Sequence, residues 1–135
     1  MVKNDHTAFQ VSDLDSAIRF YTEKLGLRFI ARDVNPEAQE AFAFLELEGG
    51  NLELIKKLDR PFQRPKIEPP YCPHFAIRTE NMAQVVEMAA KQGIRVVAGP
   101  LEIPGKVEWI YLADLDNNII ERFVSIIAKE RLTSL

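Results

Sequence analysis

Two histidines and two glutamates occupy matching places in this chain of 135 residues. His6 and His74 are its only histidines, and they lie 68 positions apart. Glu53 and Glu121 are also 68 positions apart, so each histidine precedes a glutamate by 47 residues. Imidazole nitrogens and carboxylate oxygens suit a divalent transition metal, with open positions left for water or substrate. The four side chains therefore predict a site for one divalent ion: Ni, Zn, Co, Mn or Fe.

The histidines carry most of this prediction. Glu40 and Glu108 are 68 positions apart as well, so a repeated glutamate alone indicates only duplication. Glu53 and Glu121 differ from them in context, because each lies inside an apolar run, LELI or IIERF. A carboxylate in such a run faces either solvent or a site that compensates its desolvation.

The same spacing recurs along much of the chain, which indicates an internal duplication. Two segment pairs match at a shift of 68, and a third at a shift of 67 indicates a one-residue deletion in the second half. The pairs are HTAFQV (6–11) with HFAIRT (74–79), EAFAFLELEGGNLELI (40–55) with EWIYLADLDNNIIERF (108–123), and LGLRFI (25–30) with QGIRVV (92–97).

Each half predicts a strand, a helix and three further strands. Alternating and helical periodicities define these elements, with Ser12 or Asp13 as the first helix cap and Gly26 and Gly93 as the helix ends. The predicted first-half elements are a strand at 6–11, a helix ending before Gly26, and strands near 27–34, 40–47 and 51–57. The predicted second-half elements are a strand at 74–79, a helix at about 81–92, and strands near 94–98, 106–113 and 118–125.

The predicted fold class is α+β, with two βαβββ modules in tandem that form a single domain. The modules span 1–57 and 74–125. Between them lies the connector 58–73, which holds five of the eight prolines and is predicted to be extended. Residues 126–135 are predicted to form a C-terminal tail.

Composition limits the functions to consider. The net charge of −3 gives no general attraction to nucleic acid or to an anionic membrane. No apolar run is long enough to span a bilayer, and the N-terminal segment lacks the apolar core of a secretory signal. Cys72 is the only cysteine, which excludes an internal disulfide. We therefore expect a cytoplasmic protein.

Two longer motifs resemble those of a known superfamily. HTAFQVSDLDSAIRFYTEKLGLRF resembles the opening of vicinal oxygen chelate proteins, with a ligand histidine, a hydrophobic strand, V-x-D-L, F-Y and L-G-L. LADLDNNIIERF resembles their closing strand, although Leu115 and Asn117 replace the usual proline and glycine. Asn117 tolerates the left-handed turn that this hairpin requires. The resemblance covers nearly the whole chain except the connector and the tail.

The resemblance implies two modules whose curved mixed sheets form a metal-holding cleft. The ligand order His, Glu, His, Glu is similar to that of small bacterial glyoxalase I. Carried over by position, the implied metal ligands are His6, Glu53, His74 and Glu121.

The substrate contacts depart from the glyoxalase pattern. Enzymes of that type have Arg at the position of Gln10 and Asn near Lys57, where both help to hold glutathione. Arg78, the repeat mate of Gln10, shares a face with His74 and is a candidate for holding an anionic group. The residues expected to contact substrate are Gln10, Arg78, Phe44, Trp109 and Lys106.

The leading hypothesis is a glyoxalase I-like, lactoylglutathione lyase-like enzyme. It isomerises a hemithioacetal or a related α-hydroxycarbonyl through an enediolate, which the metal stabilises. Glu121 is the expected proton carrier, with Glu53 opposite.

The superfamily also contains proteins with different functions. An epimerase would act on an acyl-CoA or similar substrate, whose phosphates would meet the basic run from Lys56 to Lys66. An extradiol dioxygenase-like enzyme is a further candidate, although the fourth ligand argues against it. A drug-binding resistance protein is the last candidate, and the aromatic residues available to line its pocket are Phe42, Phe44, Trp109 and Tyr111.

We expect a homodimer in which each metal site takes ligands from both chains. In the small glyoxalases that the chain resembles, His6 and Glu53 of one chain would face His74 and Glu121 of the other. The extended connector 58–73 is able to hold the two halves apart. It is also long enough for the halves to pair within one chain, so that arrangement stays open.

Overall fold

The chain divides into two compact units. The computed structural model describes residues 1–125, so the predicted tail at 126–135 lies outside the described residues. Unit 1 spans Met1–Pro65, and unit 2 begins at Lys66, a boundary that falls within the connector. No helix in the described part of the chain is long and apolar enough to cross a membrane.

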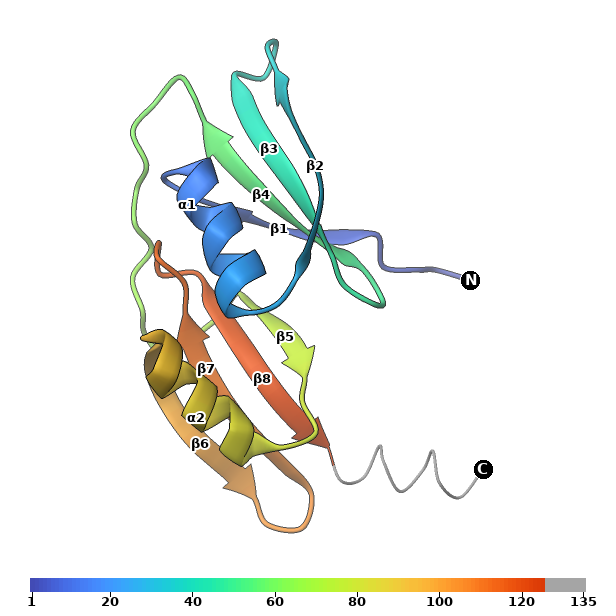
Figure 1. Cartoon of the computed structure of the whole chain (residues 1–135), viewed down its shortest axis with the longest axis vertical. Coiled ribbons are helices and arrows are strands. Elements are labelled where there is room, and N and C mark those ends of the chain that lie inside the picture. The colour runs from blue at the N-terminus through green and yellow to red at the C-terminus, as the bar shows by residue number, and fades with distance from the viewer. Residues whose placement is uncertain (126–135) are drawn as a thin grey trace. The chain divides into compact units, whose positions relative to one another are not determined.

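Unit 1 is a four-stranded mixed sheet with one helical segment (Figure 1). The strand order is β1-β4-β3-β2; β1 runs parallel to β4, and the other neighbours are antiparallel. The elements in chain order are β1 (His6–Gln10), α1 (Leu14–Arg19), the π-helical turn η1 (Phe20–Lys24), β2 (Arg28–Asn35), β3 (Glu40–Glu46) and β4 (Asn51–Lys57).

Unit 2 repeats this arrangement with the strand order β5-β8-β7-β6. Strand β5 runs parallel to β8, and the remaining pairs are antiparallel. The predicted α+β class with two βαβββ modules is therefore confirmed. The elements are β5 (His74–Arg78), α2 (Met82–Gln92), β6 (Arg95–Ile103), β7 (Val107–Ala113) and β8 (Ile119–Ser125).

Side-chain caps define where the two helices begin. The Asp13 carboxylate accepts a hydrogen bond from the Ser16 amide at 2.9 Å, and the Asn81 side chain accepts one from the Gln84 amide at 3.2 Å. Gly93 ends α2 in the left-handed conformation, with φ of 67°. The first helix widens into η1, where the Leu25 amide donates to the Phe20 carbonyl at 3.3 Å.

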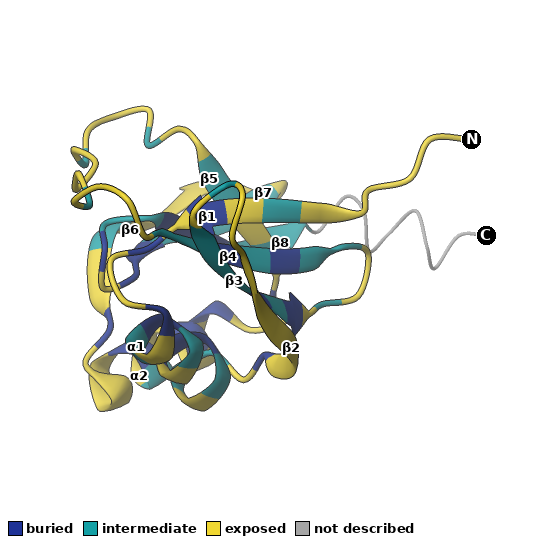
Figure 2. Cartoon of the chain, turned by 90° about the horizontal axis from the view of Figure 1, so that it is seen from above, coloured by how far each residue is buried: buried dark blue, intermediate teal, exposed yellow. Residues whose placement is uncertain are grey.

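Each sheet packs one face against the helix of its own unit and turns the other face away. In unit 1, Leu52 and Leu54 of β4 are fully buried, and α1 contacts β3 and β4. Glu53 lies between them, so strand alternation directs it to the opposite face. The edge strand β2 is exposed along its whole length, as Figure 2 shows. The helix-free face is the one that carries the predicted ligands.

The pairing of strands within each sheet shows that one predicted feature of the internal repeat is wrong. Phe44 pairs with Glu53 and Tyr111 pairs with Glu121, so β3 and β7 correspond at a shift of 67. The prediction that 40–55 matches 108–123 at a single shift of 68 is therefore wrong for these strands. The turn before β8 is one residue longer than the turn before β4, which restores the shift of 68.

The same register shows that Glu40 and Glu108, which are 68 positions apart like the ligands, are not structurally equivalent. Glu40 lies opposite Lys57, whereas Glu108 lies opposite Val124. These two residues share a sequence spacing but not a place in the fold. The His–Glu pairs, in contrast, keep equivalent places in β1 and β4 and in β5 and β8.

Candidate functional site

The first predicted ligand pair lies on neighbouring strands of unit 1. His6 begins β1, Glu53 lies in the middle of β4, and His6 Nε2 is 3.4 Å from Glu53 Oε1. On the other side of the ring, Nδ1 lies 2.7 Å from the Asp5 carboxylate. A carboxylate only accepts hydrogen bonds, so the Nδ1–H must donate to Asp5. This hydrogen bond is the largest cause that raises the pKa of the His6 imidazole. Desolvation lowers the pKa, and the charges of Glu53 and Asp5 raise it.

The second pair repeats this geometry in unit 2. His74 Nε2 lies 3.4 Å from Glu121 Oε2, and Glu121 is buried. Here the His74 Nδ1–H donates to the Tyr71 backbone carbonyl at 3.0 Å instead of to a carboxylate. The residue before His74 is Pro73, which offers no side-chain acceptor in the position that Asp5 occupies in unit 1.

Both pairs have the electronic arrangement of a cation site. The Nδ1–H group of each histidine ring donates a hydrogen bond. A neutral ring therefore carries its lone pair on Nε2, which faces a carboxylate oxygen. Two acceptors 3.4 Å apart repel one another unless a proton or a metal ion lies near both. The donor set, with one imidazole nitrogen and one carboxylate in each unit, therefore fits a divalent transition metal.

The structure brings the four predicted ligands together as two pairs. The described residues contain no group of three or more His, Cys, Asp or Glu side chains that could hold a metal ion. The union of the two pairs in one four-ligand centre stays a prediction.

Aromatic rings flank both pairs. The Phe44 ring meets the His6 ring edge-on at 5.4 Å between centroids, and Phe42 lies 5.9 Å beyond it. In unit 2, the Tyr111 ring lies 5.6 Å from the His74 ring. Phe44 thus lies beside a ligand pair, and its contact with substrate stays a prediction.

The other predicted substrate contacts lie at different distances from the two ligand pairs. Gln10 and Arg78 are exposed at the ends of β1 and β5, four residues beyond His6 and His74. Trp109 lies on β7 and shares its face with Tyr111. Lys106 is exposed in the turn before β7, roughly 16 Å along the chain from Tyr111 at the usual rise of a strand. Lys106 therefore reaches only a distal part of any ligand that contacts Glu121.

Sequence reasoning missed two residues that orient the ligands. Asp5 and Tyr71 hold the two histidine rings through hydrogen bonds to Nδ1. Asp5 had a visible signal, since an acidic residue next to a ligand histidine is a common orienting partner. Tyr71 had none, because it acts through its backbone carbonyl.

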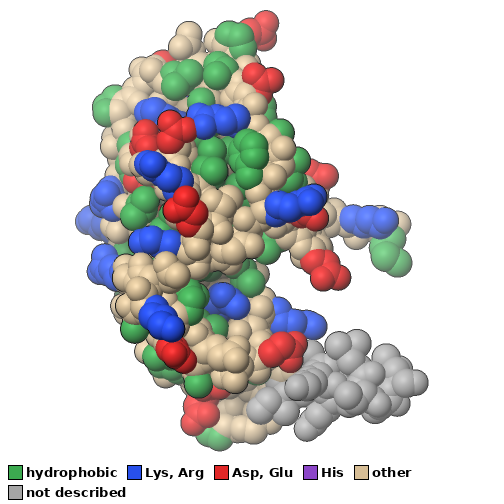
Figure 3. Space-filling view, in the orientation of Figure 1, with side chains coloured by type: hydrophobic (Ala, Val, Ile, Leu, Met, Phe, Trp, Pro, Cys, Tyr) green, Lys and Arg blue, Asp and Glu red, His purple; other side chains and the backbone are tan. Residues whose placement is uncertain are grey.

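Lysine and arginine side chains and acidic side chains are both scattered over the face seen in Figure 3. Ion pairs in unit 1 include Arg28 with Glu46 and Arg32 with Asp15.

Comparison with known proteins identifies the family. The sequence profile of the Glyoxalase/Bleomycin resistance protein/Dioxygenase superfamily matches residues 3–121. The lactoylglutathione lyase of Haemophilus influenzae is 31% identical over 119 residues, which cover 86% of this chain and 87% of that protein. The chain therefore belongs to this superfamily.

Two further relatives show how far the similarity extends. The probable chloroplastic lactoylglutathione lyase of Arabidopsis thaliana is 29% identical over 122 residues, but the match covers 85% of this chain and only 35% of that longer protein. The trypanothione-dependent glyoxalase I of Leishmania major superposes with a TM-score of 0.75 at 25% identity, over 99% of this chain and 94% of that chain.

Proposed function

We propose that the chain is a metal-dependent enzyme of the glyoxalase I type, which isomerises a hemithioacetal or a related α-hydroxycarbonyl compound. The observation that carries this proposal is the repeated His–Glu pair, with Nε2 and a carboxylate oxygen 3.4 Å apart in each unit. The similarity to lactoylglutathione lyases supports the same reaction class.

The proposed metal ligands are His6, Glu53, His74 and Glu121. A divalent ion held there would polarise the substrate oxygens and make the adjacent C–H bond more acidic. Asp5 and the Tyr71 carbonyl keep the two imidazoles in the tautomer that presents Nε2. Gln10, Arg78, Phe44, Trp109 and Lys106 stay proposed substrate contacts.

Glu121 is the proposed proton carrier, with Glu53 opposite. Glu121 accepts the proton from the carbon that bears the hydroxyl and sulfur, and an enediolate forms. The same proton is then delivered to the neighbouring carbon, which yields a thioester of a 2-hydroxy acid. The position of Glu121 favours this role, because it is buried and lies beside His74 on the ligand-bearing face.

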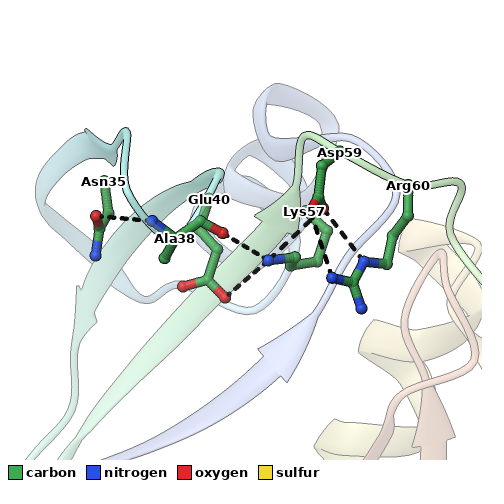
Figure 4. Close-up of polar contacts among 6 residues, drawn as sticks. All are labelled: Asn35, Ala38, Glu40, Lys57, Asp59 and Arg60. Atoms are coloured by element: carbon green, nitrogen blue, oxygen red, sulfur yellow. Dashed lines mark hydrogen bonds and ion pairs between the residues drawn. The ribbon is translucent and has the colours of Figure 1, made fainter.

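An acyl-CoA epimerase is the second candidate, and it requires free cations along the basic run from Lys56 to Lys66. Lys57 is committed elsewhere: its Nζ donates to the Ala38 carbonyl at 2.6 Å and pairs with Glu40 and Asp59 at 3.8 and 3.7 Å (Figure 4). Arg60 donates to the same Asp59 carboxylate. These contacts leave two of the basic side chains engaged within unit 1, which favours the glyoxalase-type reaction.

We further propose a homodimer with metal sites shared between chains. Each unit by itself contributes only two ligands, so a complete site needs both kinds of unit. Large hydrophobic side chains exposed on the edge strands β2 and β6 are consistent with further association. These residues are Phe29, Ile30, Val34, Val96, Leu101 and Ile103.

Elemental analysis of protein purified without a metal-affinity column tests the proposal. We expect one divalent metal per four-ligand set, and turnover when methylglyoxal is supplied with a suitable thiol. A panel of thiols, including glutathione and trypanothione, identifies the cosubstrate. A metal-containing protein that is inactive with every hemithioacetal but epimerises an acyl-CoA would replace the first candidate by the second. A stoichiometrically metal-free protein that binds aromatic drugs would indicate a resistance protein instead.

A further inference from the structure

Each ligand-bearing face continues beyond its His–Glu pair with a further row of side chains that runs across all four strands. The rows are Gln10, Ile55, Phe42 and Asp33 in unit 1, and Arg78, Phe123, Trp109 and Leu101 in unit 2. Both rows begin four residues after the ligand histidine, so they occupy equivalent places. The row of unit 1 carries an acid and no base, whereas the row of unit 2 carries a base and no acid.

The basic side chain that follows this row in unit 1 is already neutralised. Lys57 lies two residues after Ile55 on the same face of β4. Its Nζ donates to the Ala38 carbonyl at 2.6 Å and lies 3.8 and 3.7 Å from the carboxylates of Glu40 and Asp59 (Figure 4). An incoming anion would meet two negative charges around this one positive charge, so unit 1 disfavours an anion at this end of its face.

Arg78 in unit 2 has different surroundings. Its side chain is exposed, and within residues 1–125 it forms no hydrogen bond or ion pair. The next acid along the chain, Glu80, lies beyond the end of β5 and lines a groove beside α2. The N–H donors of the Arg78 guanidinium are therefore available to a ligand on the face that carries His74.

Two aromatic side chains form an apolar surface next to this guanidinium. Phe123 is the register partner of Arg78, and Trp109 is the register partner of Phe123. Both aromatic residues are half-buried, so part of each ring stays open to solvent. A carboxylate joined to an apolar group suits both features, because the guanidinium N–H groups bind the carboxylate and the rings remove the apolar group from water.

We propose that Arg78, with Phe123 and Trp109 beside it, is a specificity site for substrates that carry a carboxylate at the far end of an apolar chain. Along their strands, Arg78 lies about 13 Å from His74 and Phe123 about 7 Å from Glu121, at the usual rise per residue. A substrate that reaches both the ligand pair and Arg78 therefore needs several bonds between its reacting carbons and its charge. The assignment of this chain to the thiol part of a hemithioacetal rests on the proposed function, whereas the anion site itself does not.

Binding to the metal-free protein tests the anion site directly. Trp109 is the only tryptophan of the chain, so its fluorescence reports a ligand that covers this row. We expect phenylbutyrate to bind about threefold to tenfold more tightly than the uncharged phenylbutanol at low salt. Arg78→Gln, which copies Gln10 of unit 1, should abolish this preference, and Arg78→Lys should retain part of it. Lys91→Gln removes a positive charge from α2 instead and should leave the preference intact. Equal affinity of the two probes in wild type, a preference that survives in Arg78→Gln, or no binding of either probe would overturn the proposal.

Turnover tests the assignment to the substrate. Methylglyoxal would be supplied to the metal-loaded protein with mercaptohexanoate or with mercaptohexanol, which differ in the terminal charge. We expect a higher kcat/KM for the carboxylate, and Arg78→Gln should lose this preference through a higher KM, because the contact is the same in the ground state and the transition state. Equal kcat/KM values for the two thiols in wild type would overturn the assignment. If wild type turns over no hemithioacetal, the proposed function fails, and the fluorescence titration still decides the anion site.

Discussion

Units 1 and 2 hold their ligand pairs alike and surround them differently. Both place Nε2 of a histidine 3.4 Å from a carboxylate oxygen of a glutamate two positions further along in the parallel register. In unit 1 the outer partner of the imidazole is the Asp5 carboxylate, and in unit 2 it is the Tyr71 carbonyl. The duplicated strands thus preserve the ligand geometry, while the residues that tune it have diverged.

The difference is electrostatic as well as geometric. His6 lies between two carboxylates, Asp5 and Glu53, which stabilise a positive charge on the ring or next to it. His74 has one carboxylate neighbour, Glu121. We infer that unit 1 contributes more negative charge to the site than unit 2 does.

The largest effect is expected from removal of one ligand histidine. His74→Ala leaves Glu121 without its imidazole partner, and we expect loss of stoichiometric metal binding, measured by elemental analysis after dialysis. Arg78→Ala, on the same strand and face but outside the ligand set, is the matched control for metal content. Retention of one metal per site in His74→Ala would contradict the ligand assignment.

Substitution of the base should separate chemistry from metal binding. Glu121→Gln keeps an oxygen ligand but cannot accept a proton at neutral pH, so we expect kcat to fall by roughly 10²–10⁴-fold with a smaller loss of metal. Glu53→Gln is the matched variant in the other unit. Activity of Glu121→Gln within a few-fold of wild type would exclude Glu121 as the base and direct attention to Glu53.

Some of this asymmetry was accessible from the sequence and some was not. The spacing of His6, Glu53, His74 and Glu121 predicted which residues pair, because strand periodicity and duplication are both visible in one dimension. The shift of 67 that makes Tyr111 the mate of Phe44 was hidden, since a one-residue change in a turn leaves the apolar pattern of the strand nearly unchanged. Which side chains face one another across neighbouring strands depends on that register and so required the structure.

Subunit exchange tests whether the two kinds of unit meet across a dimer. His6→Ala and His74→Ala proteins are each expected to be inactive. If sites are shared between chains, a mixed dimer has both lesions in one site and none in the other, so about half of its sites should regain metal and activity. Wild type mixed with His6→Ala serves as the exchange control. Demonstrated exchange without recovery would place each site within a single chain.

A smaller effect is expected at Asp5. The hydrogen bond from His6 to Asp5 raises the pKa of the imidazole, which must lose its Nε2 proton before it can bind metal. Asp5→Asn keeps an acceptor but removes the charge, so the pKa of His6 should fall. The acid limit of metal binding should then move to lower pH, as measured by metal titration across a pH series. A midpoint that stays in place, or moves to higher pH, would contradict this role for Asp5.

The smallest effect is expected on the face of the sheets opposite the ligands. There, Arg122 of unit 2 occupies the position that Leu54 occupies in unit 1. Leu54 is fully buried, whereas the Nε of Arg122 is buried without a hydrogen-bond partner among the described residues. This burial lowers the pKa of the guanidinium, which is the signature of a desolvated charge. Replacement of a poorly compensated charge by an apolar side chain is often stabilising, so Arg122→Leu should raise the free energy of unfolding of the metal-free protein by about 1 kcal/mol. Leu54→Arg is the reciprocal control and should be strongly destabilising, because unit 1 has a fully buried leucine at that position. Urea unfolding measures both, and a loss of stability in Arg122→Leu would mean that the guanidinium makes a favourable interaction that offsets its desolvation.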